Sequence, residues 1–228
     1  YITYHRTDSV SLSPQFISSA RGFVEKEFGK GYLPEKPNVY KTKSKSAQEA
    51  HEAIRPTSLK TLPKEISGLD ADEYKIYSLI WKRALECQMK PAVYDQTTLS
   101  ISSDNNYLFR ATGSIIKFDG WLKVGDFLGL NGEKEALLEL PDFKENDLLT
   151  LENLDLGQHF TQPPARYSDA TLIKTLEELG IGRPSTYAPT ISTIQSRKYV
   201  IKEGRYFIPE DVAYVVNDLL VEHFPDVV

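Results

Sequence analysis

The chain has 228 residues, a mass of 25.8 kDa and a net charge of −5, with 40% hydrophobic and 26% charged residues. This length is enough for one large domain or two small ones with a buried core. No apolar run approaches the roughly 20 residues of a membrane span, and no N-terminal signal peptide is visible. The single cysteine, Cys87, excludes an internal disulfide framework and a zinc site built from several cysteines.

The charge is unevenly distributed along the chain. Basic residues exceed acidic ones by four in residues 1–60 and by three in residues 161–208. Acidic residues exceed basic ones by seven in residues 61–160 and by five in residues 209–228. A polyanion could be held between the two basic segments if the fold brings them together. The alternative is scattered, solvated surface charge.

Residues 1–28 are predicted to form a strand followed by a helix. Residues 1–7 are typical of a strand that ends in a polar turn. Ser13 and Pro14 then indicate a helix start, because Ser is a good N-cap and Pro fits the first helical position. Apolar residues recur at helical spacing as far as Phe28, and Gly29 ends the helix. The chain opens inside the strand and without Met, so we expect it to be a segment of a longer protein.

Two further helices are predicted before residue 90. Ser46 can cap a short helix that runs through Ala53 and is stopped by Arg55 and Pro56. Asp70 and Glu73 form a capping-box pattern before a longer helix. The apolar face of that helix comprises Tyr74, Tyr77, Ile80, Trp81, Ala84 and Leu85.

Residues 91–162 are predicted to be rich in β-structure. Alternating residues around 97–101 indicate a half-buried strand, and 107–118 and 147–160 also have the character of strands. The pair Pro163-Pro164 marks the next boundary.

The last segment has the element order of a winged helix-turn-helix. Ser168 caps a helix that ends at Gly180, and Pro184 begins a second one. A hairpin over residues 199–208 and an amphipathic helix over 210–223 follow.

Tyr4 and Arg6 are the first candidates for chemistry. Residues two apart on a strand point to the same face, so the two side chains can share a site. A phenol is a poor nucleophile at neutral pH, but a guanidinium beside it favours the phenolate and can also hold a phosphate oxygen. Attack on a phosphodiester would leave a covalent phosphotyrosine. The alternative is a strand with one core tyrosine and a surface arginine.

Two other groups of residues can bind phosphate. His51 and Arg55 are four apart and would lie on one helical face, although a lone His and Arg on a helix more often form a solvated face. Arg183, Ser185 and Thr186 lie at a predicted helix N-terminus, where backbone N–H groups favour anions. The alternative there is an ordinary helix start.

Three other chemistries are not indicated. No GxxxxGK[ST] loop is present, so ATP hydrolysis is not expected. His51-Glu52 is not followed by a second histidine at position 55, so it is not a zinc motif. Asp70-Ala-Asp72 is the only Asp-x-Asp sequence, and helix capping explains it better than Mg²⁺ binding.

Four segments together resemble the bacterial type IA DNA topoisomerases. Residues 1–9, which contain Tyr4-His5-Arg6, look like the active-site motif of that family and are closest to its topoisomerase I branch. Residues 49–56 resemble a second motif, residues 163–172 a third, and residues 178–188 with the stretch to Arg197 a fourth. The four occur in family order and span nearly the whole chain.

The resemblance implies an enzyme that cuts one DNA strand, passes another through and reseals it without ATP. Tyr4 would form a 5′-phosphotyrosine, Arg6 would sit on the scissile phosphate and His51 would support the site. The resemblance also implies single-stranded and negatively supercoiled DNA as partners and bacterial cytoplasm as the location. The sequence does not determine the oligomeric state, and we expect a monomer. Expected DNA contacts within the motifs are Arg55, Arg166, Arg183, Ser185, Thr186 and Arg197.

The implied fold is a mixed α and β multi-domain fragment of a toroidal core. Residues 1–90 would be a winged-helix-like nucleophile domain, 91–162 part of a β-rich arch, and 163–228 part of a helical, winged-helix-like single-strand-binding domain. The family's acidic Mg²⁺-binding domain and its zinc-ribbon tail are not in this sequence, so no metal residue is assigned here. We expect the isolated fragment to be inactive. His5 stands where many relatives have Met.

Two other functions stay open. A non-catalytic winged-helix module would bind DNA through the last segment only, and a structural arch would have no DNA affinity of its own. Covalent capture of DNA through Tyr4 distinguishes the enzyme from both.

Overall fold

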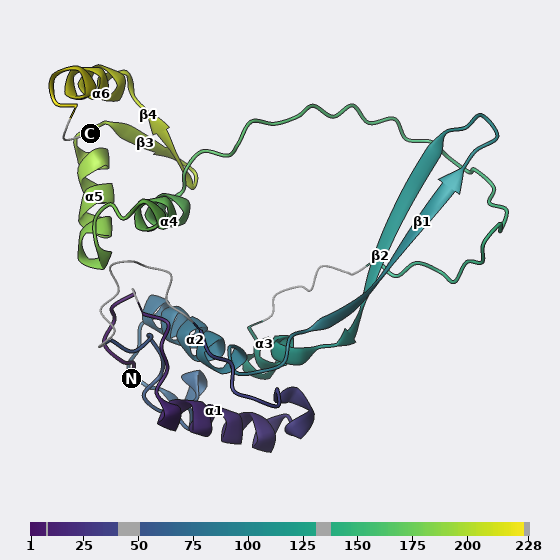
Figure 1. Cartoon of the computed structure of the whole chain (residues 1–228), viewed down its shortest axis with the longest axis horizontal. Coiled ribbons are helices and arrows are strands. Elements are labelled where there is room, and N and C mark those ends of the chain that lie inside the picture. Colours follow the sequence, from purple (N-terminus) through teal and green to yellow (C-terminus); the bar gives the residue numbers. More distant parts are fainter. Residues whose placement is uncertain (8, 41–50, 131–137, 226–228) are drawn as a thin grey trace. The chain divides into compact units, whose positions relative to one another are not determined.

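The computed structural model describes residues 1–7, 9–40, 51–130 and 138–225. These fall into two compact units, one formed by the chain up to Glu152 and the other by the chain from Asn153 onward. The elements of both are labelled in Figure 1, and the fold is mixed α and β as predicted. The division into residues 1–90, 91–162 and 163–228 stays a prediction.

The two long helices of the first unit begin where the sequence predicts. Helix α1 spans Pro14–Glu27, and the Ser13 hydroxyl accepts a hydrogen bond from the Phe16 N–H at 3.4 Å. Helix α2 spans Ala71–Glu86, and the Asp70 carboxylate accepts from the N–H of Glu73 at 2.8 Å. The Glu73 carboxylate accepts from the Asp70 N–H at 3.0 Å, which completes the capping box.

The core of the first unit is built from α1, α2 and the short helix α3 (Lys123–Leu128). Trp81 is fully buried, with its ring 5.4 Å from that of Phe23 and 6.4 Å from that of Phe127. Val124 is also fully buried. The stretch predicted to be β-rich therefore contributes a helix to this core. The described residues of this unit also form three single-turn 3-10 helices: η1 (Lys30–Tyr32), η2 (Pro63–Glu65) and η3 (Gly120–Leu122).

A long antiparallel hairpin projects from these helices (Figure 1). Strands β1 (Val93–Ser102) and β2 (Leu108–Phe118) pair in the register Thr98 to Thr112, which confirms two of the three predicted strands. At the root of the hairpin, the Tyr32 hydroxyl donates to Asp119 at 2.8 Å and the Trp121 N–H donates to the Lys90 carbonyl at 3.1 Å. These contacts fasten the hairpin to the helical core.

The third predicted strand, residues 147–160, is wrong. These residues have no strand structure, and Leu148 and Leu156 are 98% and 90% exposed. A strand needs a neighbour to satisfy its backbone N–H and C=O groups, and none of the described residues pairs with this stretch along a ladder. Alternating leucines are therefore not enough to form a strand here.

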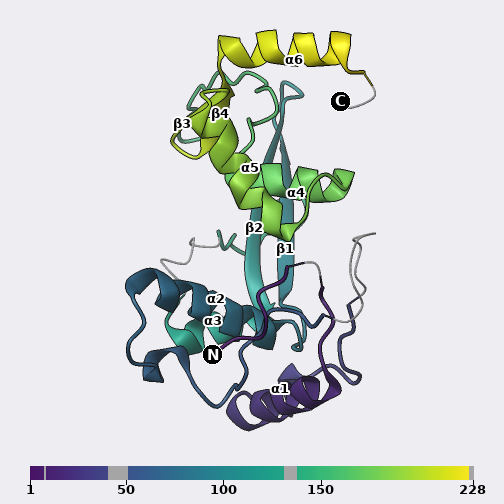
Figure 2. The same ribbon diagram turned by 90° about the vertical axis from the view of Figure 1, so that its left-hand side faces the viewer.

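The second unit has the predicted order of elements (Figure 2). It comprises α4 (Asp169–Leu179), α5 (Pro184–Ser196), β3 (Val200–Glu203), β4 (Tyr206–Pro209) and α6 (Asp211–His223). Among the described residues of this unit, Ile191 and Phe207 are the buried apolar ones, and the Phe207 N–H donates to the Tyr167 carbonyl at 2.8 Å. None of the helices in the described residues is long and apolar enough to cross a membrane.

Candidate functional site

The first two motifs lie side by side in the first unit. Ile2 and Pro56 form an isolated antiparallel bridge, and the Thr3 N–H donates to the Arg55 carbonyl at 2.9 Å. The Thr3 hydroxyl donates to the Ala53 carbonyl at 2.8 Å and accepts from the Arg55 N–H at 3.0 Å. Thr3 therefore fastens the segment that carries Tyr4 to the segment that carries His51.

The local conformations differ from the predicted strand and helix. Only the bridge at Ile2 is strand-like within residues 1–7, and the Arg6 N–H donates to the Tyr4 carbonyl at 2.9 Å in a tight turn. Strand alternation therefore does not relate the side chains of Tyr4 and Arg6. Residues 51–53 are not helical, and the rest of the predicted helix, 46–50, lies outside the described residues. His51 and Arg55 thus share no helical face, because their backbone groups bond the N-terminal segment instead.

The phenol of Tyr4 is exposed beside two imidazoles. Its side chain is 68% exposed, and its ring centroid lies 6.0 Å from that of His51 and 5.2 Å from that of His5. His51 is half-buried, and its Nδ1 atom is buried without a hydrogen-bond partner among the described residues. A ligand would thus reach His51 through the other edge of its ring. An accessible hydroxyl next to two potential donors suits attack on an anionic group.

The His51 backbone is fixed from the side of the N-terminal segment. The buried Ser9 hydroxyl donates to the His51 carbonyl at 2.6 Å, and the Ala53 N–H donates to the Ser11 carbonyl at 2.7 Å. Sequence reasoning did not single out Ser9. Its partner is 42 residues away in the chain, so no local pattern could reveal the contact.

Arg55 is engaged inside the protein. Its Nε and Nη2 atoms donate to the two carboxylate oxygens of Glu52 at 2.7 and 2.8 Å, and its Nη1 atom donates to the Pro56 carbonyl at 3.0 Å. The guanidinium also lies 4.6 Å from the centroid of the Phe16 ring. A DNA contact by Arg55 stays a prediction, and this geometry favours a structural role. In the sequence, the opposite charges of Glu52 and Arg55, three residues apart, were the feature that could have indicated this ion pair.

Glu52 stays ionised to lower pH than an ordinary glutamate. Burial acts to raise the pKa of Glu52, but the hydrogen bonds from Arg55 and Ser13 and the charge of Arg55 outweigh it and lower that pKa. The carboxylate is therefore charged throughout the neutral range.

The start of α5, where an anion site is predicted, has a well-defined local structure, and anion binding there stays a prediction. Arg183 is the N-cap residue, and the Thr186 hydroxyl accepts from the Arg183 N–H at 2.8 Å and donates to its carbonyl at 3.0 Å. Arg183 Nη1 donates to the Gly182 carbonyl at 2.6 Å. Gly182 has a φ of +73°, and a Cβ there would lie 2.9 Å from the Thr186 hydroxyl, so glycine is required. Thr186 thus serves to close the helix end.

The other predicted DNA contacts of the second unit are exposed. Ser185 lies in the first turn of α5, and Arg197 follows its last residue. Arg166 precedes α4. DNA binding by these side chains stays a prediction that their accessibility supports.

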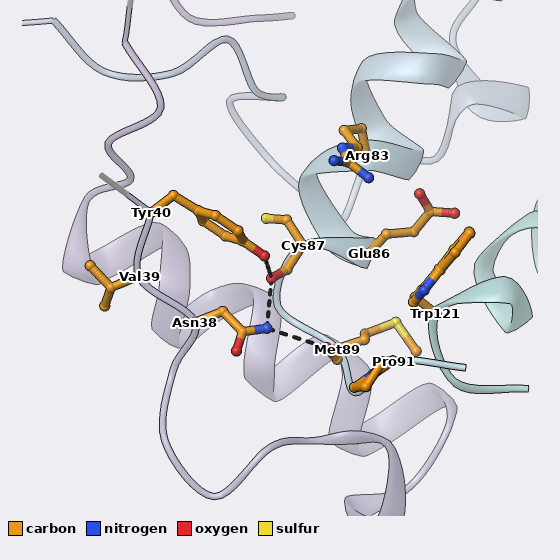
Figure 3. A pocket seen from close by; sticks show the side chains of 9 residues that line it. All are labelled: Asn38, Val39, Tyr40, Arg83, Glu86, Cys87, Met89, Pro91 and Trp121. Atoms are coloured by element: carbon orange, nitrogen blue, oxygen red, sulfur yellow. Dashed lines mark hydrogen bonds between the residues drawn. The ribbon is translucent and has the colours of Figure 1, made fainter. Parts of the chain in front are cut away.

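A separate cavity of about 330 Å³ lies at the root of the hairpin (Figure 3). The Tyr40 hydroxyl donates to the Cys87 carbonyl at 2.7 Å on one side of it, and Glu86 and Trp121 line the other. Glu86 is 7% exposed, and burial raises its pKa although Lys82 and Arg83 act in the opposite direction. Burial likewise raises the pKa of the Cys87 thiol. Among the described residues, no group of three or more His, Cys, Asp or Glu could hold a metal ion.

Comparisons with known proteins agree with the motif pattern. DNA topoisomerase 1 of Vibrio cholerae is 49% identical over 226 residues, which is 99% of this chain and 25% of that protein. DNA topoisomerase 1 of Escherichia coli is 48% identical over 224 residues, again 25% of its length. The structure of full-length topoisomerase I from Thermotoga maritima is similar with a TM-score of 0.77 and 34% identity, covering 99% of this chain and 36% of that one. This chain thus spans about a quarter of the length of the first two relatives.

The family model described as DNA topoisomerase matches residues 1–228. The chain therefore belongs to the DNA topoisomerase family. Its relatives named DNA topoisomerase 1 confirm the resemblance to the topoisomerase I branch of the bacterial type IA enzymes.

Proposed function

We propose that this chain is the part of a type IA DNA topoisomerase that carries the nucleophile, Tyr4. The deprotonated Tyr4 oxygen attacks the phosphorus of a DNA strand, a 5′-phosphotyrosine forms and the 3′-oxygen leaves. The reverse attack by that oxygen reseals the strand after another has passed, so no ATP is consumed. The enzyme would relax negatively supercoiled DNA.

One observation carries this proposal. Tyr4 is exposed, and the chain places it beside His51, 47 positions later, through hydrogen bonds between the two motif segments. The exposure leaves the Tyr4 side chain within reach of a DNA strand. We further propose that Arg6 and His51 bind the scissile phosphate, and that Mg²⁺ binds residues of the intact protein outside this chain.

The second unit would hold the single strand. Exposed Arg166, Ser185 and Arg197, together with the N-terminal end of α5 at Arg183, offer donors for phosphates. Contacts to the backbone rather than to bases would give weak sequence preference. A non-catalytic winged-helix module stays the second candidate, since the second unit has the complete order of that motif.

The test is covalent capture of an end-labelled single-stranded oligonucleotide by the intact protein. Tyr4→Phe should abolish the covalent product and the relaxation of supercoils, while oligonucleotide binding survives. Tyr1→Phe is the matched control, because Tyr1 is 67% exposed and lies on the same segment. Covalent product from the Tyr4→Phe variant would refute the proposal that Tyr4 is the nucleophile. Binding by the wild-type protein without any covalent product would favour the non-catalytic module.

A further inference from the structure

We infer that Glu52 is a positioning residue that holds the Tyr4 and His51 side chains in their mutual arrangement. The inference rests on the proposed function of Tyr4 and adds to it a residue that does not touch the reacting groups. Its basis is the set of contacts that the Glu52 carboxylate makes with Ser13 and Arg55.

The carboxylate joins its own segment, residues 51–55, to the start of α1. Glu52 Oε1 accepts from the backbone N–H of Ser13 at 2.7 Å and from Arg55 Nε at 2.7 Å, and Oε2 accepts from Arg55 Nη2 at 2.8 Å. The side chains of Glu52 and Arg55 are 28% and 14% exposed, so solvent competes little with the pair. Two parallel N–H···O bonds fix both the distance and the plane of the two groups.

The Ser13 contact fastens this pair to α1. Ser13 is the N-cap residue of α1, so the carboxylate lies near the positive end of the helix dipole. The guanidinium of Arg55 covers the ring of Phe16, which is 5% exposed and belongs to the same helix. Glu52 thus ties residues 51–55 to α1, in addition to their hydrogen bonds with Thr3, Ser9 and Ser11.

The same pair also sets the position of Tyr4. The Arg55 backbone exchanges hydrogen bonds with Thr3, the residue before Tyr4. Tyr4 is 68% exposed, so its own side chain has little packing to hold it in place. His51 is the residue before Glu52, and its carbonyl is held by Ser9. Tyr4 is therefore adjacent in sequence to Thr3, which the Arg55 backbone holds, and His51 is adjacent to Glu52 itself.

Removing the carboxylate should change the rate of cleavage more than the affinity for DNA. A misplacement of about 1 Å in a reacting group costs up to about 100-fold in rate. Affinity depends on many phosphate contacts spread over the protein.

The experiment uses the intact protein with Glu52→Ala, Glu52→Gln, Arg55→Ala and the double variant Glu52→Ala/Arg55→Ala. Single-turnover cleavage of a labelled oligonucleotide is followed well below each melting temperature. The dissociation constant is measured in a Tyr4→Phe background. Glu27→Gln is the control: Glu27 pairs with Lys26 at 2.8 Å at the far end of α1, about 20 Å from Ser13.

We expect Glu52→Ala to slow cleavage about 10- to 100-fold with less than about a twofold change in the dissociation constant. Glu52→Gln, which keeps an acceptor for Ser13, should lose less. The double variant should be no slower than Glu52→Ala, because the two residues act as a unit. The plateau of the pH–rate profile should fall while its midpoint stays in place.

Two results would overturn the inference. One is cleavage by folded Glu52→Ala at the wild-type rate, and the other is a loss of affinity equal to the loss of rate. Cleavage that persists in Tyr4→Phe would instead refute the proposed nucleophile, so the two failures can be told apart.

Discussion

The ring of Tyr4 lies 6.0 Å from the ring of His51, with an angle of 32° between their planes, although 47 positions separate the two residues in the chain. Neither a regular strand nor a helix produces this proximity. It results from the hydrogen bonds of Thr3 with residues 53–55 and of Ser9 with His51. The candidate site is thus a pairing of two irregular segments that the neighbouring α1 holds in place.

Acid should weaken the anchoring by Glu52. The folded-state pKa of Glu52 is lowered from 4.5, so its stabilising contribution is complete above that value and is lost as the pH falls through the folded pKa. Glu52→Gln should therefore lower the free energy of unfolding at pH 7 by about 1 kcal/mol, and by less near pH 4. Urea unfolding of both proteins at the two pH values checks this. An equal difference at both would contradict the prediction.

The contribution of Glu86 to stability should depend on pH in the opposite direction to that of Glu52. Burial raises its folded-state pKa above 4.5, so the ionised carboxylate costs stability at neutral pH and the cost disappears as the pH falls through the folded pKa. Glu86→Gln should stabilise the protein by about 1 kcal/mol at pH 7.5 and leave it unchanged near pH 4. Thermal melting at both pH values is the measurement, and the exposed Glu25→Gln serves as control. Destabilisation at pH 7.5 would show that the contact with Lys82, at 3.7 Å, outweighs burial.

Arg183 and Arg197 should contribute to salt-sensitive binding of single strands. Each removed phosphate contact lowers the slope of log affinity against log salt by about 0.7. Arg183→Ala/Arg197→Ala should therefore weaken binding and flatten the slope by about 1.4, measured by fluorescence anisotropy of a short labelled oligonucleotide in the intact protein. Lys174→Ala, which removes an exposed charge paired with Glu178, is the control. An unchanged slope in the double variant would remove both arginines from the DNA path.

Gly120 should not tolerate a side chain. Its φ is +50°, and a Cβ would lie 2.5 Å from the Pro91 carbonyl oxygen at the root of the hairpin. Gly120→Ala should cost about 1–3 kcal/mol, because the left-handed conformation and the contact are both unfavourable. Gly31→Ala is the control, since a Cβ there meets nothing within 4 Å. Equal melting temperatures for the two variants would contradict this account.

Local features of the sequence determined where α1, α2, α4 and α5 begin. The caps at Ser13, Asp70 and Ser168, the helix start at Pro184 and the hairpin around Gly204 all formed as predicted, because each depends on groups a few residues apart. The motif pattern likewise identified the family, since it needs only residue identity and order.

Only the tertiary structure decided how the candidate site is built. Residues 51–53 are not helical, because their backbone groups bond to the N-terminal segment, which is far away in the sequence. Residues 147–160 do not form a strand, because none of the described residues pairs with them along a ladder. Arg55 packs on Phe16 and Glu52 accepts a hydrogen bond from Ser13, and both partners lie some forty residues earlier in the chain. Side-chain chemistry is therefore readable from the sequence, whereas the partner that each side chain finds depends on which distant segments the core brings together.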